Sequence, residues 1–130
     1  MGGSPKVLVV DDDPGIVDLV KTLLEAEGFS VLSACNGLEA LREVEQHRPD
    51  IVLLDVMMPL MDGITCCKEL RNNPDTSDTL VVVMSATVDI AELKGIGATD
   101  FIAKPFDNDH LVRLLNTRLQ TRKGLSPSAN

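Results

Sequence analysis

The stretch that most constrains the fold is residues 51–63, which read IVLLDVMMPLMDG. Four consecutive apolar residues lead into a lone carboxylate, Asp55. The run is short and β-branched at its start, which favours a buried strand over a helix. Pro59 ends the extended segment, and Asp62 can then cap a helix. In an open parallel sheet, ligand chemistry lies outside the carboxyl ends of the strands, so Asp55 occupies a position suited to reaction.

Similar short apolar runs alternate with amphipathic segments along the whole chain. The predicted strands are 6–10, 29–34, 51–55, 80–84 and 101–103. The predicted helices are 14–27, a segment between Asn36 and Pro49, a segment from Asp62 to the polar loop 72–79, a short segment broken by Gly95 and Gly97, and a last segment through Leu111 and Leu119. This alternation predicts an α/β fold with a doubly wound, flavodoxin-like, five-stranded parallel sheet. The expected strand order is 2-1-3-4-5, with helices on both faces and the first and last helices sharing one face.

Composition limits both the size and the type of the protein. The 130 residues, 44% hydrophobic and 25% charged, suit one domain, placed at 6–122 after an N-terminal extension at 1–5. We interpret residues 123–130 as a tail or the start of a linker. A net charge of -8 and the absence of Trp and Tyr argue against direct nucleic-acid binding. No apolar run approaches the roughly 20 residues that span a bilayer, so we expect no membrane contact and a cytoplasmic location.

The three cysteines, Cys35, Cys66 and Cys67, form no CxxC pair and have no histidine close by in sequence. They are therefore interpreted as small apolar fillers and not as metal ligands. The two histidines, His47 and His110, fall in predicted helices away from the strand ends and are expected at the surface.

The predicted sheet brings several chemically active side chains to one edge. Asp11 and Asp12 follow the first strand and Asp55 ends the third, and these strands are neighbours in the expected order. Carboxylates about 4 Å apart repel by roughly 4 kcal/mol at an effective dielectric of 20, so the cluster requires a cation. Oxygen ligands favour Mg²⁺, with Mn²⁺ as a substitute. Ser85 and Lys104 reach the same edge, which describes a site that holds a phosphoryl group while a carboxylate attacks it.

Four motifs carry a family resemblance: VVDDDP, LLDVMMPLMDG, MSAT and FIAKPF. In this order and spacing they resemble the receiver domain of two-component response regulators, over about residues 5 to 122. The resemblance implies that Asp55 is the phosphoacceptor. It also implies that Asp11, Asp12, Asp55 and the backbone carbonyl of Met57 hold Mg²⁺.

The same resemblance implies roles for the later motifs. Ser85 would hydrogen-bond the phosphoryl group, Lys104 would pair with its oxygens, and the Lys104–Pro105 peptide would be cis. Phe101 matches the aromatic residue that receivers turn inward when the serine moves, so Ser85 and Phe101 form the expected switch. Ser85 and Lys104 stand 19 positions apart, about one helical turn less than receivers usually have, which predicts a short fourth helix.

The function implied is a phosphorylation-dependent switch that signals through the fourth helix, the fifth strand and the last helix. Its phosphoryl donor would be a sensor histidine kinase or a phosphotransfer protein, and its downstream effector is unknown. Such a protein catalyses only its own phosphorylation and dephosphorylation. A Mg²⁺-dependent phosphatase would require a second carboxylate at the position of Met57, so the sequence argues against that class of enzyme. A receiver-like interaction module that works without phosphorylation remains an alternative.

Overall fold

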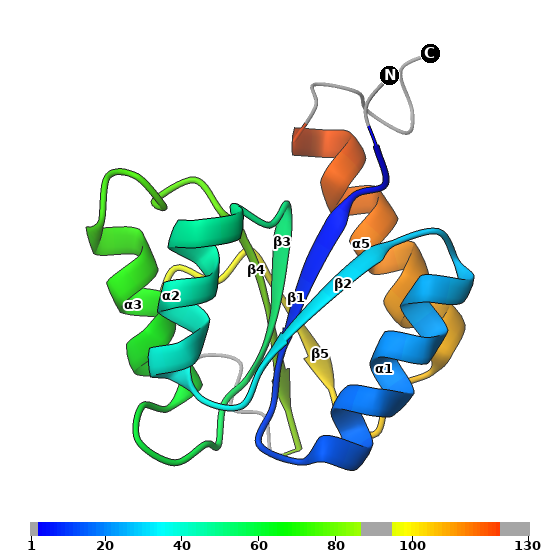
Figure 1. Cartoon of the computed structure of the whole chain (residues 1–130), viewed down its shortest axis with the longest axis horizontal. Coiled ribbons are helices and arrows are strands. Elements are labelled where there is room, and N and C mark those ends of the chain that lie inside the picture. Colours follow the sequence, from blue (N-terminus) through cyan, green and yellow to red (C-terminus); the bar gives the residue numbers. More distant parts are fainter. Residues whose placement is uncertain (1–2, 87–94, 123–130) are drawn as a thin grey trace.

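The computed structural model describes residues 3–86 and 95–122, which form a parallel sheet covered by helices (Figure 1). Five strands lie in the order β2-β1-β3-β4-β5, all pairs parallel. This confirms the predicted fold and strand order. The elements in chain order are β1 (Lys6–Val10), α1 (Pro14–Ala26), β2 (Ser30–Ala34), α2 (Gly37–His47), β3 (Ile51–Asp55), α3 (Gly63–Asn72), β4 (Leu80–Ser85), β5 (Asp100–Ala103) and α5 (Asn108–Arg122).

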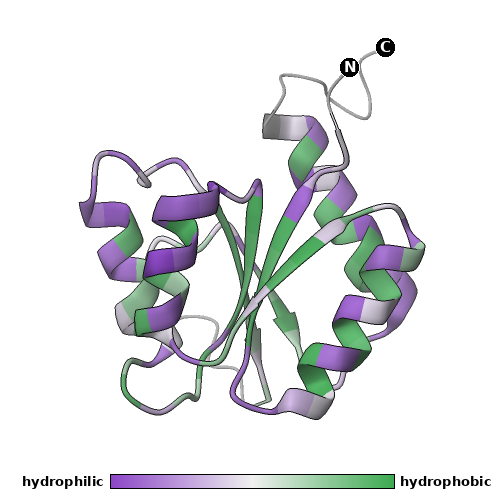
Figure 2. Ribbon diagram, viewed as in Figure 1, coloured by the Kyte–Doolittle hydropathy of each residue, from purple (hydrophilic) through white to green (hydrophobic). Residues whose placement is uncertain are grey.

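The helices divide between the two faces of the sheet. Helices α1 and α5 cover one face and α2 and α3 cover the other, as Figure 1 shows. Because successive strand residues point to opposite faces, each central strand supplies both layers of the core. Val7 and Val9 pack toward α1 and α5, whereas Leu8 and Val10 pack toward α2 and α3. The central strands β1, β3 and β4 are therefore apolar along most of their length (Figure 2).

Local capping explains where the helices begin. The side chain of Asp13 accepts a hydrogen bond from the amide of Gly15, Asn36 accepts one from Glu39, and Asp62 accepts one from Thr65. Each bond satisfies an amide that the helix itself leaves unpaired. The cap predicted at Asp62 is thus confirmed, and the observed element ends differ from the predicted ones by only one residue at several places.

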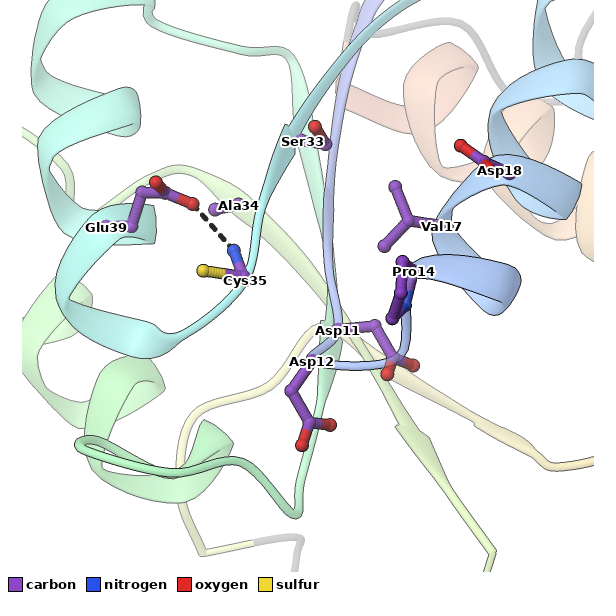
Figure 3. A pocket seen from close by; sticks show the side chains of 9 residues that line it. All are labelled: Asp11, Asp12, Pro14, Val17, Asp18, Ser33, Ala34, Cys35 and Glu39. Atoms are coloured by element: carbon purple, nitrogen blue, oxygen red, sulfur yellow. Dashed lines mark hydrogen bonds between the residues drawn. The ribbon is translucent and has the colours of Figure 1, made fainter.

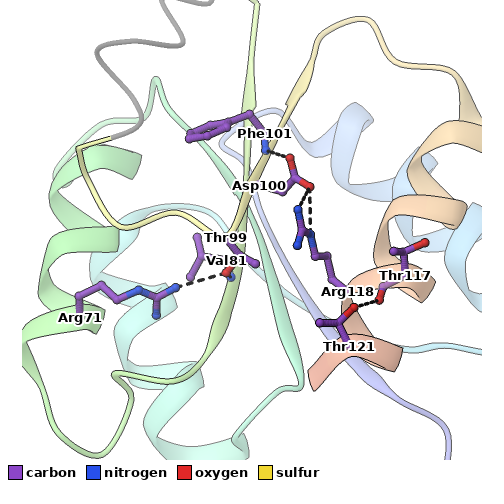
Figure 4. Close-up of polar contacts among 8 residues, drawn as sticks. All are labelled: Arg71, Val81, Thr99, Asp100, Phe101, Thr117, Arg118 and Thr121. Atoms are coloured by element: carbon purple, nitrogen blue, oxygen red, sulfur yellow. Dashed lines mark hydrogen bonds and ion pairs between the residues drawn. The ribbon is translucent and has the colours of Figure 1, made fainter. Parts of the chain in front are cut away.

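Side-chain contacts fix β5, the shortest strand, to its surroundings (Figure 4). The guanidinium of Arg118 donates twice to one carboxylate oxygen of Asp100, at 2.7 and 3.0 Å. Arg71 of α3 donates to the carbonyls of Gly97 and Thr79, at 2.8 and 2.7 Å. These contacts tie the chain entering β5 to α3 and the strand itself to α5.

Two sequence-based expectations fall on parts of the chain that are not described. The expected short fourth helix falls mostly on residues 87–94 and the expected tail on 123–130, both outside the described residues. The boundaries at 1–5, 6–122 and 123–130 stay predictions. Within the described ranges, no helix has the length and apolar character needed to cross a membrane.

The packing of α1 predicts unequal effects for two leucines on that helix. Leu24 is fully buried and Leu19 is 57% exposed. We expect Leu24→Ala to lower the free energy of unfolding by about 2–5 kcal/mol, because it leaves a cavity. The control Leu19→Ala should change it by less than about 0.5 kcal/mol. Urea unfolding followed by circular dichroism measures both, and equal losses would contradict this account of α1.

Candidate functional site at the carboxyl edge of the sheet

Four of the predicted site residues meet where the strands end. Asp11 follows β1, Asp55 is the last residue of β3, Ser85 is the last residue of β4, and Lys104 follows β5. Strands β1 and β3 are hydrogen-bonded neighbours, and all strands run in the same direction. The topology therefore brings residues separated by up to 93 positions to one edge of the sheet.

Three carboxylates form the centre of this edge. Asp11, Asp12 and Asp55 each offer an oxygen, and these oxygens lie within 4.8 Å of one another. Asp11 and Asp55 are buried, with 2% and 6% of their surface exposed, whereas Asp12 is exposed. A compact set of hard oxygen donors with one solvent-facing member suits a divalent cation that keeps part of its water shell.

Lys104 compensates part of this negative charge. Its ammonium nitrogen lies 2.8 Å from Oδ2 of Asp11 and 3.1 Å from Oδ1 of Asp55. The other oxygen of Asp11 accepts a hydrogen bond from the amide of Asp13 at 2.9 Å. Lys104 thus binds the two buried carboxylates and leaves the exposed Asp12 at the rim.

Burial raises the pKa of the Asp55 carboxyl above its usual value, and the charges of Asp11 and Asp12 add to that effect. The hydrogen bond and charge of Lys104 act in the opposite direction without cancelling the rise. For Lys104, burial alone would lower the pKa of the ammonium group. Its hydrogen bonds to Asp11 and Asp55 outweigh burial and raise that pKa. The lysine is therefore firmly charged at neutral pH.

Ser85 is the last residue of β4 and Met57 lies in the loop after β3. The roles assigned to both stay predictions. Ser85 is buried, and its carbonyl oxygen accepts a hydrogen bond from the amide of Lys104 at 2.8 Å. The Lys104–Pro105 peptide is cis, as the resemblance implied. The side chain of Met57 is 76% exposed, so it is not the core residue that methionine often is.

The remaining candidates lie outside the acidic centre. Phe101 is partly buried against the core cluster on the α2 and α3 side of the sheet. His47 and His110 are exposed, which confirms their predicted surface positions.

Two of the three cysteines behave as predicted. Cys66 and Cys67 are buried, and burial raises the pKa of the Cys66 thiol to about 12, which makes that thiol inert. Cys35 is exposed, so its interpretation as a buried filler is wrong. Cys35 follows β2, which lies at the edge of the sheet. The apolar sequence pattern predicts more burial at this edge than the structure shows.

A pocket of about 350 Å³ lies beside the acidic centre, between the start of α1 and the turn after β2 (Figure 3). Pro14 and Val17 form part of its apolar wall, and Asp12 and Glu39 contribute carboxylates. Glu39 is held in place, because its side chain accepts a hydrogen bond from the amide of Cys35 at 2.6 Å. The sequence pattern does not reveal this pocket, since its walls come from separate elements.

Gly63, the first residue of α3, has a role that the sequence pattern does not reveal. A Cβ atom at this position would overlap the carbonyl oxygen of Asp55. The amide of Gly63 donates to the carbonyl of Val56 at 2.9 Å. The absence of a side chain therefore lets α3 begin directly against the end of β3. In the sequence, the only local indication of this role is that Gly63 directly follows the helix cap Asp62.

Comparison with known proteins places this geometry in context. The response regulator receiver domain family matches residues 7–116. The transcriptional regulator RpaA of Synechocystis is 36% identical over 119 residues, which cover 89% of this chain and 49% of RpaA. The response regulator MtrA of Mycolicibacterium smegmatis is 37% identical over 115 residues, covering 88% of this chain and 50% of MtrA. The chain thus spans about half the length of these curated relatives.

Solved structures agree with the sequence comparison. The receiver domain of Francisella response regulator 1452 is 36% identical with a TM-score of 0.84, covering 92% of this chain and 99% of that one. The chemotaxis protein CheY4 of Vibrio cholerae is 31% identical with a TM-score of 0.83, covering 88% of this chain and 98% of that one. The family match over residues 7–116 includes Asp11, Asp12, Asp55 and Lys104.

The electrostatics of the site predict that neutralising Asp55 stabilises the protein. The raised pKa means that the folded state disfavours the ionised carboxylate, so folding is weakened above the folded-state pKa and recovers as pH falls through it. In Asp55→Asn the amide oxygen can still accept from Lys104, but the charge is gone. We expect an unfolding temperature about 2–5 °C higher than wild type at pH 7 without divalent cations.

The difference between Asp55→Asn and wild type should shrink in an acidic buffer, where the wild-type carboxyl is protonated. Thermal unfolding followed by circular dichroism at both pH values measures it. Asp78→Asn, at an exposed position, is the control and should match wild type. An unfolding temperature unchanged or lowered in Asp55→Asn at pH 7 would contradict the electrostatic argument.

Proposed function

Since the chain belongs to the response regulator receiver domain family, we propose that it is a phosphorylation-dependent signalling switch whose phosphoacceptor is Asp55. The observation that carries this proposal is the placement of Lys104 between Asp11 and Asp55, beside the carboxylate of Asp12. A receiver domain is not a conventional enzyme. It would turn over no external substrate and would catalyse only the transfer to and from its own aspartate.

The donor set fits Mg²⁺, with Mn²⁺ as a substitute. Asp11, Asp12, Asp55 and the backbone carbonyl of Met57 would hold the ion, whose charge would neutralise the phosphoryl oxygens during transfer. A carboxylate oxygen of Asp55 attacks the phosphorus of a phosphohistidine, the phosphorus–nitrogen bond breaks, and the imidazole leaves as it takes up a proton. Lys104 then pairs with a phosphoryl oxygen, and the hydroxyl of Ser85 donates a hydrogen bond to another.

The partners follow from this chemistry. A sensor histidine kinase or a phosphotransfer protein would supply the phosphohistidine, and a downstream effector would read the phosphorylated state. RpaA and MtrA are described as DNA-binding regulators, but the matched part of each is about half of its length. For the residues in this chain, the net charge of -8 argues against direct contact with nucleic acid.

The output would leave the site through β5 and α5. When Ser85 moves toward the phosphoryl group, Phe101 would turn inward and fill the space that the serine vacates. Phe101 has no hydroxyl group, so this movement would depend on packing alone. The alternative is a receiver-like interaction module that works without phosphorylation, and the complete set of acids, serine and lysine argues against it.

Phosphorylation provides the direct test of this function. We expect incubation with Mg²⁺ and acetyl phosphate to add one phosphoryl group, detected by intact mass. Asp55→Ala should abolish the adduct, because no other residue would carry it. The control is Asp78→Ala, which removes an exposed carboxylate from the loop before β4, and it should be phosphorylated like wild type. A wild-type chain with no adduct would refute the proposal, and an adduct that persists in Asp55→Ala would refute the assignment of the acceptor.

The switch makes a separate structural prediction. Crystal structures with and without a phosphoryl mimic at Asp55 should show two rotamers of Phe101, the inward one in the presence of the mimic. Phe101→Ala should still accept the phosphoryl group, since the side chain does not line the acidic centre. One unchanged rotamer in both crystals would show that Phe101 is a permanent part of the core.

A further inference from the structure

The loop between β3 and α3, residues 56–62, contains an energetically unfavourable turn. The amide of Met61 donates to the carbonyl of Pro59 at 2.8 Å, so the hydrogen bond spans only two residues. Leu60, at the centre, has a φ of 67°, a value that side chains other than glycine rarely adopt. Leu60 is also 79% exposed, so burial of its side chain does not offset this strain. Contacts elsewhere must hold the loop in this form.

One such contact joins the loop to the first residue of α2. The amide of Gly37 donates to the carbonyl of Met61 at 3.2 Å. A Cβ atom at Gly37 would lie 2.7 Å from that carbonyl oxygen and 2.8 and 2.9 Å from Cγ and Cβ of Met61. Two of these three atoms belong to the backbone or to its first side-chain carbon, so they cannot move away without moving the loop.

The geometry of α2 does not otherwise require glycine at this position. The φ of Gly37 is outside the left-handed region, so alanine could adopt the same backbone conformation. Alanine is also the better helix former. The close approach of Met61 is therefore what excludes a side chain at Gly37.

The loop held by this contact begins immediately after Asp55. At its other end, Gly63 lies against the carbonyl of Asp55, and its amide donates to the carbonyl of Val56. The loop between Asp55 and Met61 includes Met57, whose backbone carbonyl is a proposed ligand of Mg²⁺. A displacement of Met61 would therefore shift the backbone on which that carbonyl stands.

We propose that Gly37 is a positioning residue for the Mg²⁺ site: the lack of a side chain lets Met61 rest on α2, which holds the loop and its Met57 carbonyl in place. Gly37 touches none of the reacting groups and acts only through Met61. This inference rests on the proposed function, because it concerns the same metal site. It adds a contribution from α2, an element that supplies none of the proposed ligands.

The test is Gly37→Ala, with Mg²⁺ binding measured by isothermal titration calorimetry. We expect the dissociation constant for Mg²⁺ to rise about tenfold, as it does when groups that orient metal ligands are altered. The Mg²⁺ concentration for half-maximal phosphorylation by acetyl phosphate should rise by a similar factor. The rate at saturating Mg²⁺ should stay close to wild type, since Asp55, Ser85 and Lys104 are untouched.

Gly95→Ala is the matched control, because a Cβ atom there meets none of the described residues within 4 Å. It should bind Mg²⁺ like wild type. If Gly37→Ala does not fold, the substitution is introduced into a chain that already carries Leu60→Gly. Leu60→Gly removes the strain at the turn and stabilises the loop. The Leu60→Gly chain then serves as the reference.

A folded Gly37→Ala chain that binds Mg²⁺ within twofold of its reference would overturn the inference, whatever its thermal stability. A lower unfolding temperature with unchanged Mg²⁺ affinity would show that the contact is structural only. If wild type binds Mg²⁺ but accepts no phosphoryl group, the proposed function fails, while the calorimetric comparison still decides the role of Gly37.

Discussion

The contact of Lys104 with two buried carboxylates is the interaction on which the arrangement of the site depends. Asp11 and Asp55 lie at the ends of adjacent strands, where their mutual repulsion would otherwise oppose the pairing of β1 with β3. The lysine reaches them from the segment after β5, across the position of β4. Asp12, which Lys104 does not contact, remains the exposed member of the set. Lys104 thus offsets part of the negative charge, and the site retains negative charge that would attract a cation.

The core makes this placement rigid. All five residues of β3 are buried, and the strand pairs with β1 on one side and β4 on the other. Its side chains alternate between the two core clusters, so a shift of β3 along its axis would disturb the packing on both faces of the sheet. Asp55 is therefore fixed by the strand that carries it, whereas Met57 belongs to a loop and requires separate support.

This difference explains which features the sequence could predict. Strand ends and helix caps depend on a few adjacent residues, so the positions of Asp55 and of the caps Asn36 and Asp62 follow from local pattern. The strand order then implies that Asp11 and Asp55 meet. The contacts of Gly37 with Met61, of Arg71 with Gly97 and of Arg118 with Asp100 join residues that are 18 or more positions apart.

Periodicity and capping contain no information about such pairs, because they describe which face a residue occupies and not which residue it touches. From the sequence alone, the glycine at the start of α2 is only a weak helix former. The structure shows that the backbone of Met61 packs against it. The exposure of Cys35 is a similar case, because apolar content alone does not distinguish the end of an edge strand from a central one.

The bonds that stabilise the unmodified site are also those that a phosphoryl group would replace. The ammonium of Lys104 now satisfies Asp11 and Asp55, both at hydrogen-bonding distance. A phosphoryl group on Asp55 consumes one of these carboxylate oxygens and presents new oxygens with greater charge, to which the lysine would transfer. Asp11 would then depend on the cation for compensation. Cation binding and phosphorylation would therefore be coupled through one lysine, and any element that positions the cation, including the loop that rests on Gly37, would act on both.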